Sequence, residues 1–439
     1  MTNTQVHTTL SIPEILLPST NQDLSKWAVI ACDQYTQDRE YWKKTAEIVG
    51  DSPSTLSMIL PEVYLEDSGR DEKLAAIRKN MNTYLANKVF AEAIKGFIYL
   101  ERKTAYGRKR NGLMVTIDLD SYEWKPGSKA LIRATEATIQ DRIPPRMEIR
   151  RGAPLEIPHI MLLVNDPKKT LIEAIGSVVR VKKPLYDTSL MHNAGSITGW
   201  SVSTAEEISQ VQKALAVIAE KNTAEDGSCF LFAVGDGNHS LATAKAVWEE
   251  FRDTHQKEAA EGIIDLENHN ARFALVELVN LFDEGLTFEP IHRVVFGTTA
   301  KESAQFLAAK LGGTIDFNCN LNEIEKIVDS STSTCFGFID STGCCILKSP
   351  HPALAVSRLQ PALDDFLTQN AELRIDYIHG AEEVFRLGKE KNTVSILLPP
   401  VEKDSFFSTI DTGGPLPRKS FSMGEASEKR FYLECRKLF

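Results

Sequence analysis

The segment from Cys229 to Phe251 constrains the fold most. Residues 229–234 form an unbroken apolar run, of a length that suits a strand buried within a sheet. Apolar residues then recur at helical spacing at Leu241, Ala244, Val247 and Phe251. Only Gly235–Ser240 connects the two patterns. We therefore predict a strand, a tight loop and a helix in direct succession.

The same alternation of strand and helix patterns continues along the chain. Thr204 and Glu207 form a capping box, and a helix is predicted from there to about Lys221. No repeat or heptad run interrupts the alternation, which predicts an α/β (mixed α+β) fold. At 439 residues the chain exceeds the roughly 250–300 residues that one core supports. We predict a ligand-site lobe over residues 1–287, a second α/β lobe over 288–405, and a segment over 406–439 that returns to the site.

Charge and cysteine content exclude several classes of protein. Lys and Arg total 50 against 60 for Asp and Glu, so the net charge of −10 disfavours nucleic-acid binding and makes a nuclease the least favoured function. Seven cysteines form no C-x-x-C pair and no evident disulfide framework, which favours a reducing, cytoplasmic location. No apolar run is long enough to span a membrane, and the first residues do not resemble a signal peptide. The oligomeric state stays open.

The loop Gly235–Ser240 carries the strongest chemical signal. A helix that begins directly after a strand directs its first N–H groups and its dipole at the mouth of the loop, where an anion binds. Gly237 permits close backbone approach, and Asp236 and His239 supply a carboxylate and an imidazole for metal binding or proton transfer. Neither the P-loop nor the dinucleotide-binding glycine pattern is present. The alternative is a tight turn in which Asn238 or Ser240 only caps the helix.

A second carboxylate follows another apolar run. Asp33 comes directly after Trp27–Cys32, at the carboxyl end of a predicted strand, where ligands of open sheets collect. It is therefore a candidate metal or substrate ligand, and the alternative is an aspartate that starts a turn.

Several short motifs together resemble those of the family known as domain of unknown function 1015. The resemblance covers nearly the whole chain and rests on the following segments: Ala31-Cys32-Asp33-Gln34-Tyr35, Ile132-Arg133-Ala134-Thr135-Glu136, Asp141-Arg142-Ile143-Pro144-Pro145-Arg146, Gly235–Ser240, His292-Arg293 and Pro417-Arg418-Lys419-Ser420-Phe421. Many members carry Asp-Gly-His-His-Arg where this chain has Asp236 to Ser240, so the final Arg is lost here. The loop is also similar to an element of the ParB and sulfiredoxin superfamily, which includes free serine kinases.

The resemblance implies a small-molecule phosphotransferase. The expected reaction is nucleotide-dependent transfer to a serine-like hydroxyl, with Mg²⁺ and an adenine nucleotide as cofactors and Asp33 and Asp236 as metal ligands. Asp236, His239 and Glu136 are the expected catalytic residues. Because Ser240 replaces the family's Arg, the phosphate charge must be neutralised from elsewhere. The expected substrate and phosphate ligands are Gly237, Asn238, Ser240, Arg133, Arg142, His292, Arg293 and Lys419.

Each of these assignments has a plainer alternative. Arg133 and Glu136 are equally compatible with a surface ion pair, and His292-Arg293 with a pair at the edge of a core. The competing function is a nucleotide-binding regulatory protein without turnover, in which the bound nucleotide acts as a switch.

Overall fold

The computed structural model describes residues 9–331, 335–351 and 353–439, and its chain divides into two compact units. Unit 1 comprises the described residues up to Ala134, Thr138–Leu286 and Glu425–Phe439. Unit 2 comprises Thr135–Ala137 and Thr287–Gly424. The chain therefore leaves unit 1 and returns to it with its last fifteen residues.

Unit 1 is built on a mixed sheet of ten strands. Its central strands β14 (Phe273–Asn280), β10 (Met161–Val164), β13 (Phe232–Asp236) and β8 (Ile132–Ala134) are neighbours in that order. β10 pairs parallel with β14 and antiparallel with β13, and β13 pairs parallel with β8. This mixture confirms the predicted α/β (mixed α+β) class. The other strands are β1 (Leu10–Ser11), β5 (Phe97–Thr104), β6 (Lys109–Asp118), β7 (Tyr122–Glu123), β11 (Tyr186–Ser189) and β12 (Gly195–Val202).

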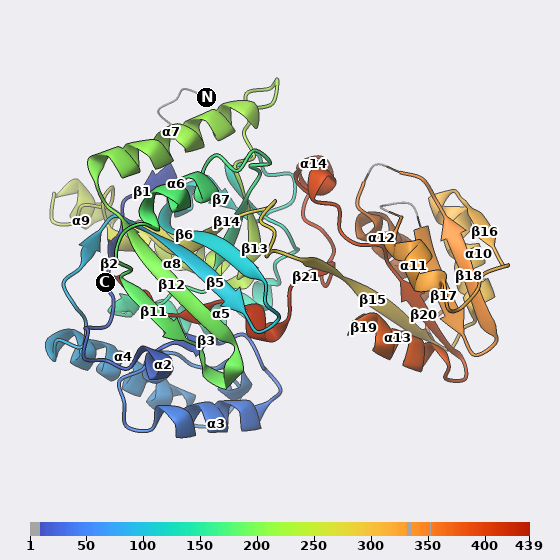
Figure 1. Ribbon diagram of the computed structural model, residues 1–439, viewed down its shortest axis with the longest axis horizontal. Helices are drawn as coiled ribbons and strands as arrows, with labels where there is room; N and C mark the ends of the chain where they lie inside the picture. The colour runs from blue at the N-terminus through green and yellow to red at the C-terminus, as the bar shows by residue number, and fades with distance from the viewer. Residues whose placement is uncertain (1–8, 332–334, 352) are drawn as a thin grey trace. The chain divides into compact units, whose positions relative to one another are not determined.

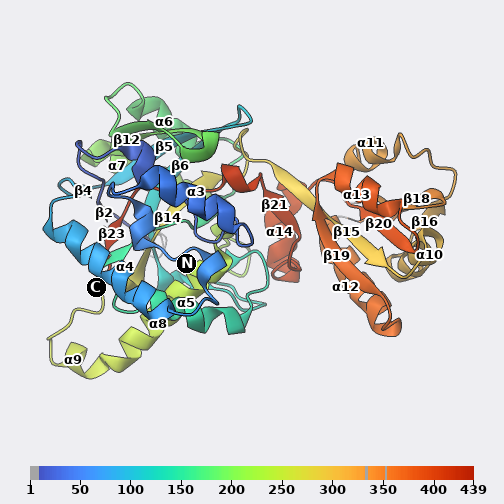
Figure 2. The ribbon, with the colours of Figure 1, turned by 90° about the horizontal axis from the view of Figure 1, so that it is seen from below.

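Helices cover both faces of this sheet (Figure 1). Figure 2 shows α6 (Ile172–Val179) and α7 (Ala205–Lys221) on one side, and α5 (Ile143–Arg150) and α8 (Asn238–Thr254) on the other. The capping box of Thr204 and Glu207 is present at the start of α7, as predicted. The predicted strand at 229–234 lies two to three residues further on, as β13, because the residues before Phe232 form the approach to the sheet. The remaining helices of this unit are α2 (Leu24–Trp27), α3 (Arg39–Val49), α4 (Arg70–Ala86) and α9 (Gln256–Ala260).

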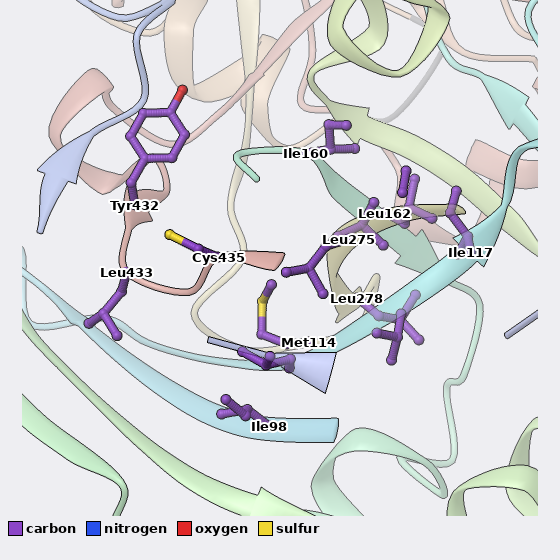
Figure 3. Close-up of a cluster of buried hydrophobic side chains, with 14 of the residues drawn as sticks. Ile98, Met114, Ile117, Ile160, Leu162, Leu275, Leu278, Tyr432, Leu433 and Cys435 are labelled. Carbon is purple, nitrogen blue, oxygen red and sulfur yellow. The ribbon is translucent and has the colours of Figure 1, made fainter. Parts of the chain in front are cut away.

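The C-terminal residues complete the core of unit 1. β22 (Phe431–Tyr432) pairs with β3 (Val29–Ile30), and β23 (Arg436–Lys437) pairs with β9 (Leu155–Glu156). Figure 3 shows Leu433 and Cys435 beside a cluster of aliphatic side chains from β5, β6, β10 and β14. Tyr432 lies at the margin of this cluster with its hydroxyl directed away from Leu433 and Cys435. A small further sheet pairs β2 (Glu14–Ile15) with β4 (Ile94–Lys95).

Unit 2 has a separate sheet, ordered β16–β18–β17–β20–β15–β19, with β21 paired to the start of β15. Its strands are β15 (Phe288–Phe296), β16 (Thr314–Asp316), β17 (Cys335–Asp340), β18 (Gly343–Lys348), β19 (Arg374–His379), β20 (Thr393–Leu397) and β21 (Phe421–Met423). Its helices are α10 (Ala300–Leu311), α11 (Ile324–Asp329), α12 (Ala355–Gln369), α13 (Ala381–Gly388) and α14 (Lys403–Gly413).

Two further observations concern membrane-spanning helices and disulfides. Within the described ranges, no helix combines the length and the apolar character needed to cross a bilayer. Cys319 and Cys344 form a disulfide, with their Cα atoms 5.8 Å apart. The cysteine spacing did not predict this pair, because tertiary packing brings the segment before α11 against β18.

Candidate functional site

The loop after β13 is held close to the start of β10. Gly237 has φ +80°, a left-handed conformation that glycine adopts without steric cost, and α8 begins at the next residue. A Cβ atom at Gly237 would lie 3.0 Å from Cγ1 of Ile160 and 3.1 Å from its Cα. The ladder between β10 and β13 shifts register here, between Met161 and Leu162. Glycine at position 237 therefore lets the first turn of α8 approach Ile160 closely.

A chain of hydrogen bonds runs from this first turn through a histidine that precedes β10. Ser240 Oγ lies 2.7 Å from His159 Nε2, and the Tyr432 hydroxyl lies 2.8 Å from His159 Nδ1. The backbone N–H of Cys32 donates to the Tyr432 oxygen at 3.0 Å. Ser240 and Tyr432, which are far from His159 in the sequence, thus meet at its imidazole.

The two ring nitrogens of His159 have different partners. Nδ1 faces the Tyr432 hydroxyl, and Nε2 faces Ser240 Oγ. Burial raises the pKa of Tyr432 well above its usual value, so its hydroxyl keeps its proton. The orientation of the imidazole ring is therefore set by one hydrogen-bonding group on each side.

Two carboxylates lie close to these groups. Asp33 Oδ2 is 3.6 Å from His159 Nε2, and its other oxygen accepts from Gln34 Nε2. Asp236 Oδ1 accepts from Gly237 N–H, and its Oδ2 is 3.4 Å from Lys429 Nζ. Lys429 therefore supplies a cation at the loop where Ser240 replaces the family's Arg.

Asp33 and Asp236 are compatible with magnesium but do not form a ready-made cage for it. Mg²⁺ is commonly held by one or two carboxylates together with substrate phosphates and water. Across the residues that the structure describes, neither aspartate belongs to a group of three protein ligands whose donor atoms lie within 4.8 Å. A magnesium ion at this site would therefore take part of its coordination from a bound phosphate.

A cavity of about 150 Å³ adjoins Ser240 and His159. An apolar cavity of this volume accommodates one ring-sized group. Cys32 and Tyr432 contribute to its wall, as do the ion pairs Arg146–Glu62 and Arg150–Glu156. The remaining lining is mainly apolar: Met58, Ile59, Leu60, Leu65, Met81, Ile149, Ala153, Leu155, Ile157, Pro158, Ile160, Leu438 and the partly polar Thr243. The cavity thus offers apolar walls next to the polar first turn of α8.

His239 points to a different neighbour from Ser240. Its Nε2 accepts a hydrogen bond from the backbone N–H of Ile139 at 3.2 Å, so it ties the loop before α5 to α8. Consecutive residues of a helix project about 100° apart, which separates the two side chains. The catalytic role expected for His239 stays a prediction, and His159 is the imidazole that contacts Ser240.

Two arginines expected to bind phosphate have other surroundings in unit 1. The Arg133 guanidinium lies 4.5 Å from the ring centre of Phe230, which precedes β13, and its Nε donates to the Ala130 carbonyl. The loop at Asp236 follows the opposite end of β13. Arg142 is exposed at the start of α5, where its carbonyl accepts from Arg146. Phosphate binding by these two residues stays a prediction.

The other expected site residues form a cluster of their own in unit 2. Burial lowers the pKa of Arg293 to about 10, although Tyr377 and Glu136 favour its charged form. Arg293 and Lys419 lie 4.8 and 5.0 Å from the ring centre of Tyr377. Glu136 accepts from the Ser420 N–H at 3.3 Å. His292 is buried and accepts from the Leu398 N–H through Nδ1. The roles expected for these residues remain predictions.

Sequence reasoning missed His159, Tyr432 and Lys429. The available signal for His159 was a polar residue within the apolar run from Ile157 to Asn165. Lys429 and Tyr432 gave no local signal, because they reach the site only through the return of the C-terminal residues to unit 1.

Three solved structures are similar to this chain at low sequence identity. The free serine kinase in complex with AMP is 10% identical, with 74% of this chain and 92% of that chain covered and a TM-score of 0.37. A conserved hypothetical protein from Pyrococcus furiosus is 12% identical, with coverages of 73% and 90% and a TM-score of 0.33. A C-terminally truncated SbnI from Staphylococcus aureus is 8% identical, with coverages of 73% and 82% and a TM-score of 0.35. These values are too low to transfer a site or an activity.

Other comparisons address the family directly. The curated proteins gave no match, and the expected relation to the ParB and sulfiredoxin superfamily stays a prediction. The family model described as protein of unknown function (DUF1015) matches residues 16–366, which is most of the chain and includes β13, the loop at Asp236 and α8. The chain therefore belongs to the DUF1015 family.

Proposed function

We propose that unit 1 binds an adenine nucleotide and transfers a phosphoryl group to the hydroxyl of a small molecule such as serine. The observation that carries the proposal is the cavity beside Ser240. Its apolar walls suit an aromatic base, and the first turn of α8 next to it suits a phosphate. A ligand with an aromatic ring and an anionic group matches both features.

Phosphoryl transfer depends mainly on positioning and on neutralisation of the phosphate oxygens. Lys429 supplies a positive charge beside Asp236, and Ser240 places a hydroxyl at the cavity wall for contact with a phosphate oxygen. When bound by Asp33 or Asp236, a magnesium ion would neutralise further phosphate charge. In the transfer, the terminal phosphoryl group moves from the nucleotide to the acceptor oxygen, and the acceptor's proton passes to a carboxylate. Asp236 and Asp33 are the two carboxylates of this loop region.

The test combines binding and turnover on the full-length chain. Calorimetry with AMP and ADP measures binding, and ADP formation from ATP and Mg²⁺ with a panel of hydroxyl amino acids measures transfer. We expect Asp236→Asn to reduce turnover by several orders of magnitude, and His159→Gln by roughly 10²–10⁴-fold if the imidazole takes part in proton transfer. His239→Ala, measured in the same turnover assay, shows whether transfer depends on His239 or on His159. His255→Gln is the matched control, since this histidine stacks on Phe251 and does not line the cavity. Failure of the wild-type chain to bind any adenine nucleotide would contradict the proposal.

One observation favours the second candidate, a nucleotide-binding regulatory protein without turnover. Asp236 is engaged by Gly237 N–H and Lys429, so this carboxylate is partly occupied before any acceptor binds. Nucleotide binding together with no transfer to any acceptor in the panel would support this candidate.

A further inference from the structure

The C-terminal segment Glu425–Phe439 supplies several groups of the candidate site. Lys429 pairs with Asp236, Tyr432 bonds to His159 and Cys32, and Leu438 lines the cavity. The indole N–H of Trp27 also donates to the Leu433 carbonyl, which fixes the segment beside β3. The geometry of the site therefore depends on how firmly this segment is held.

The segment is anchored by one fully buried arginine. Arg430 donates to Glu277 Oε2 on β14 at 2.6 Å and to Glu434 four residues further on. Glu434 in turn accepts from the Tyr186 hydroxyl on β11. Arg430, Glu277 and Glu434 side chains are each no more than 1% exposed. The network links the C-terminal segment to two strands of the main sheet.

Charges buried this deeply stay charged only because they are paired. Burial by itself raises the pKa of Glu277, yet Arg110 and Arg430 outweigh burial and hold that pKa below its usual value. Removal of Arg430 would leave Glu277 paired with Arg110 but take the cation from buried Glu434, which is strongly unfavourable. The network therefore holds the C-terminal segment firmly in place.

The same network also fixes the backbone on both sides of His159. Arg430 Nε donates to the carbonyl of Pro158 at 3.0 Å, and the backbone N–H of Glu277 donates to the carbonyl of Ile160 at 2.9 Å. Arg430 is two residues from Tyr432, so one guanidinium holds both partners of the bond between Tyr432 and His159.

We propose that Arg430 is a positioning residue that holds the His159 imidazole between Tyr432 and Ser240, through its bonds to Pro158 and to the anchors of the C-terminal segment. Its effect on activity rests on the proposed function, whereas its effect on His159 does not. Arg430 touches no ligand-facing atom of the cavity and acts only through other residues. Displacement of reacting groups by about 1 Å reduces rates by about 10²-fold.

The experiment uses a variant that removes Arg430 together with Glu434, because buried Glu277 keeps Arg110 as an ion-pair partner at 3.4 Å. Arg430→Met combined with Glu434→Gln eliminates the bonds of Arg430 to Glu277, Glu434 and Pro158 without leaving a buried carboxylate unpaired. Arg272→Met is the matched control, because Arg272 forms a bidentate pair with Asp118 elsewhere in unit 1. Circular dichroism establishes folding of each full-length variant. If the double variant does not fold, Arg430→Lys, which keeps the charge but loses the planar fork, takes its place.

The primary measurement is ¹⁵N NMR of the imidazole groups, with the His159 signals assigned by their loss in His159→Gln. We expect the His159 signals of Arg272→Met to match those of the wild-type chain, and the His159 signals of the Arg430 variant to shift, because its hydrogen bonds to Tyr432 and Ser240 change. ATP turnover should fall by about 10²-fold in the same variant only. A folded Arg430 variant with wild-type His159 signals would overturn the proposal. If wild-type protein binds no nucleotide, the proposed function fails, and the NMR comparison still decides the role of Arg430.

Discussion

Substitution of Gly237 by alanine tests whether the close approach of α8 to Ile160 controls the site. Two effects are expected to act together. Alanine at φ +80° is strained by about 1–2 kcal/mol, and its Cβ would lie 3.0 Å from Ile160 Cγ1 and 3.1 Å from Ile160 Cα. Because a backbone atom is involved, Ile160 must shift by a few tenths of an ångström, and such overpacking costs about 1–3 kcal/mol. Gly237→Ala should therefore lower the free energy of unfolding by about 2–5 kcal/mol.

Gly127 provides the matched control. It has φ +76°, and a Cβ atom there would meet nothing within 4 Å, so Gly127→Ala measures the backbone strain alone at about 1–2 kcal/mol. Urea unfolding gives the stabilities, and calorimetry with ADP gives the affinity. We expect Gly237→Ala to be less stable than Gly127→Ala and to bind ADP more weakly, since Ile160 adjoins His159. Equal stabilities of the two variants, with wild-type ADP affinity in both, would refute the reasoning.

Three further predictions concern charge, pH and the disulfide. Lys429→Met should weaken ADP binding by about tenfold or more, because it removes one charge-assisted contact worth about 1.5–3 kcal/mol. Lys129→Met is the surface control and should bind ADP as the wild type does, with both affinities measured by calorimetry. Burial lowers the pKa of His292 to about 4, so its stabilising contribution is complete above the unfolded value of about 6.5 and is lost as the pH falls toward 4. The loss amounts to about 3 kcal/mol, and urea midpoints at pH 7 and 4.5 should differ less in His292→Asn than in the wild type. Thiol titration of denatured, unreduced protein should find the five free cysteines, and a count of seven thiols would contradict the Cys319–Cys344 pair. Cys319→Ser should lower the free energy of unfolding by about 3 kcal/mol.

Local patterns in the sequence determined the strand, loop and helix on which the candidate site is built. The apolar run after Cys229, the glycine at position 237 and the helical spacing from Leu241 predicted a strand, a tight loop and a helix, which are β13, Gly237 and α8. The capping box at Thr204 likewise predicted the start of α7. Such signals act within a few residues, because backbone conformation and capping depend on near neighbours.

The partners of the candidate site were decided only by the tertiary structure. Ser240 meets a histidine 81 positions away, and that histidine meets a tyrosine 273 positions away. His239 has the more conspicuous place in the loop, but helix geometry turns it toward Ile139. Lys429 reaches Asp236 because Arg430 anchors the returning chain on Glu277. Contacts between residues so far apart depend on how sheets and segments pack, and local sequence patterns do not predict that packing.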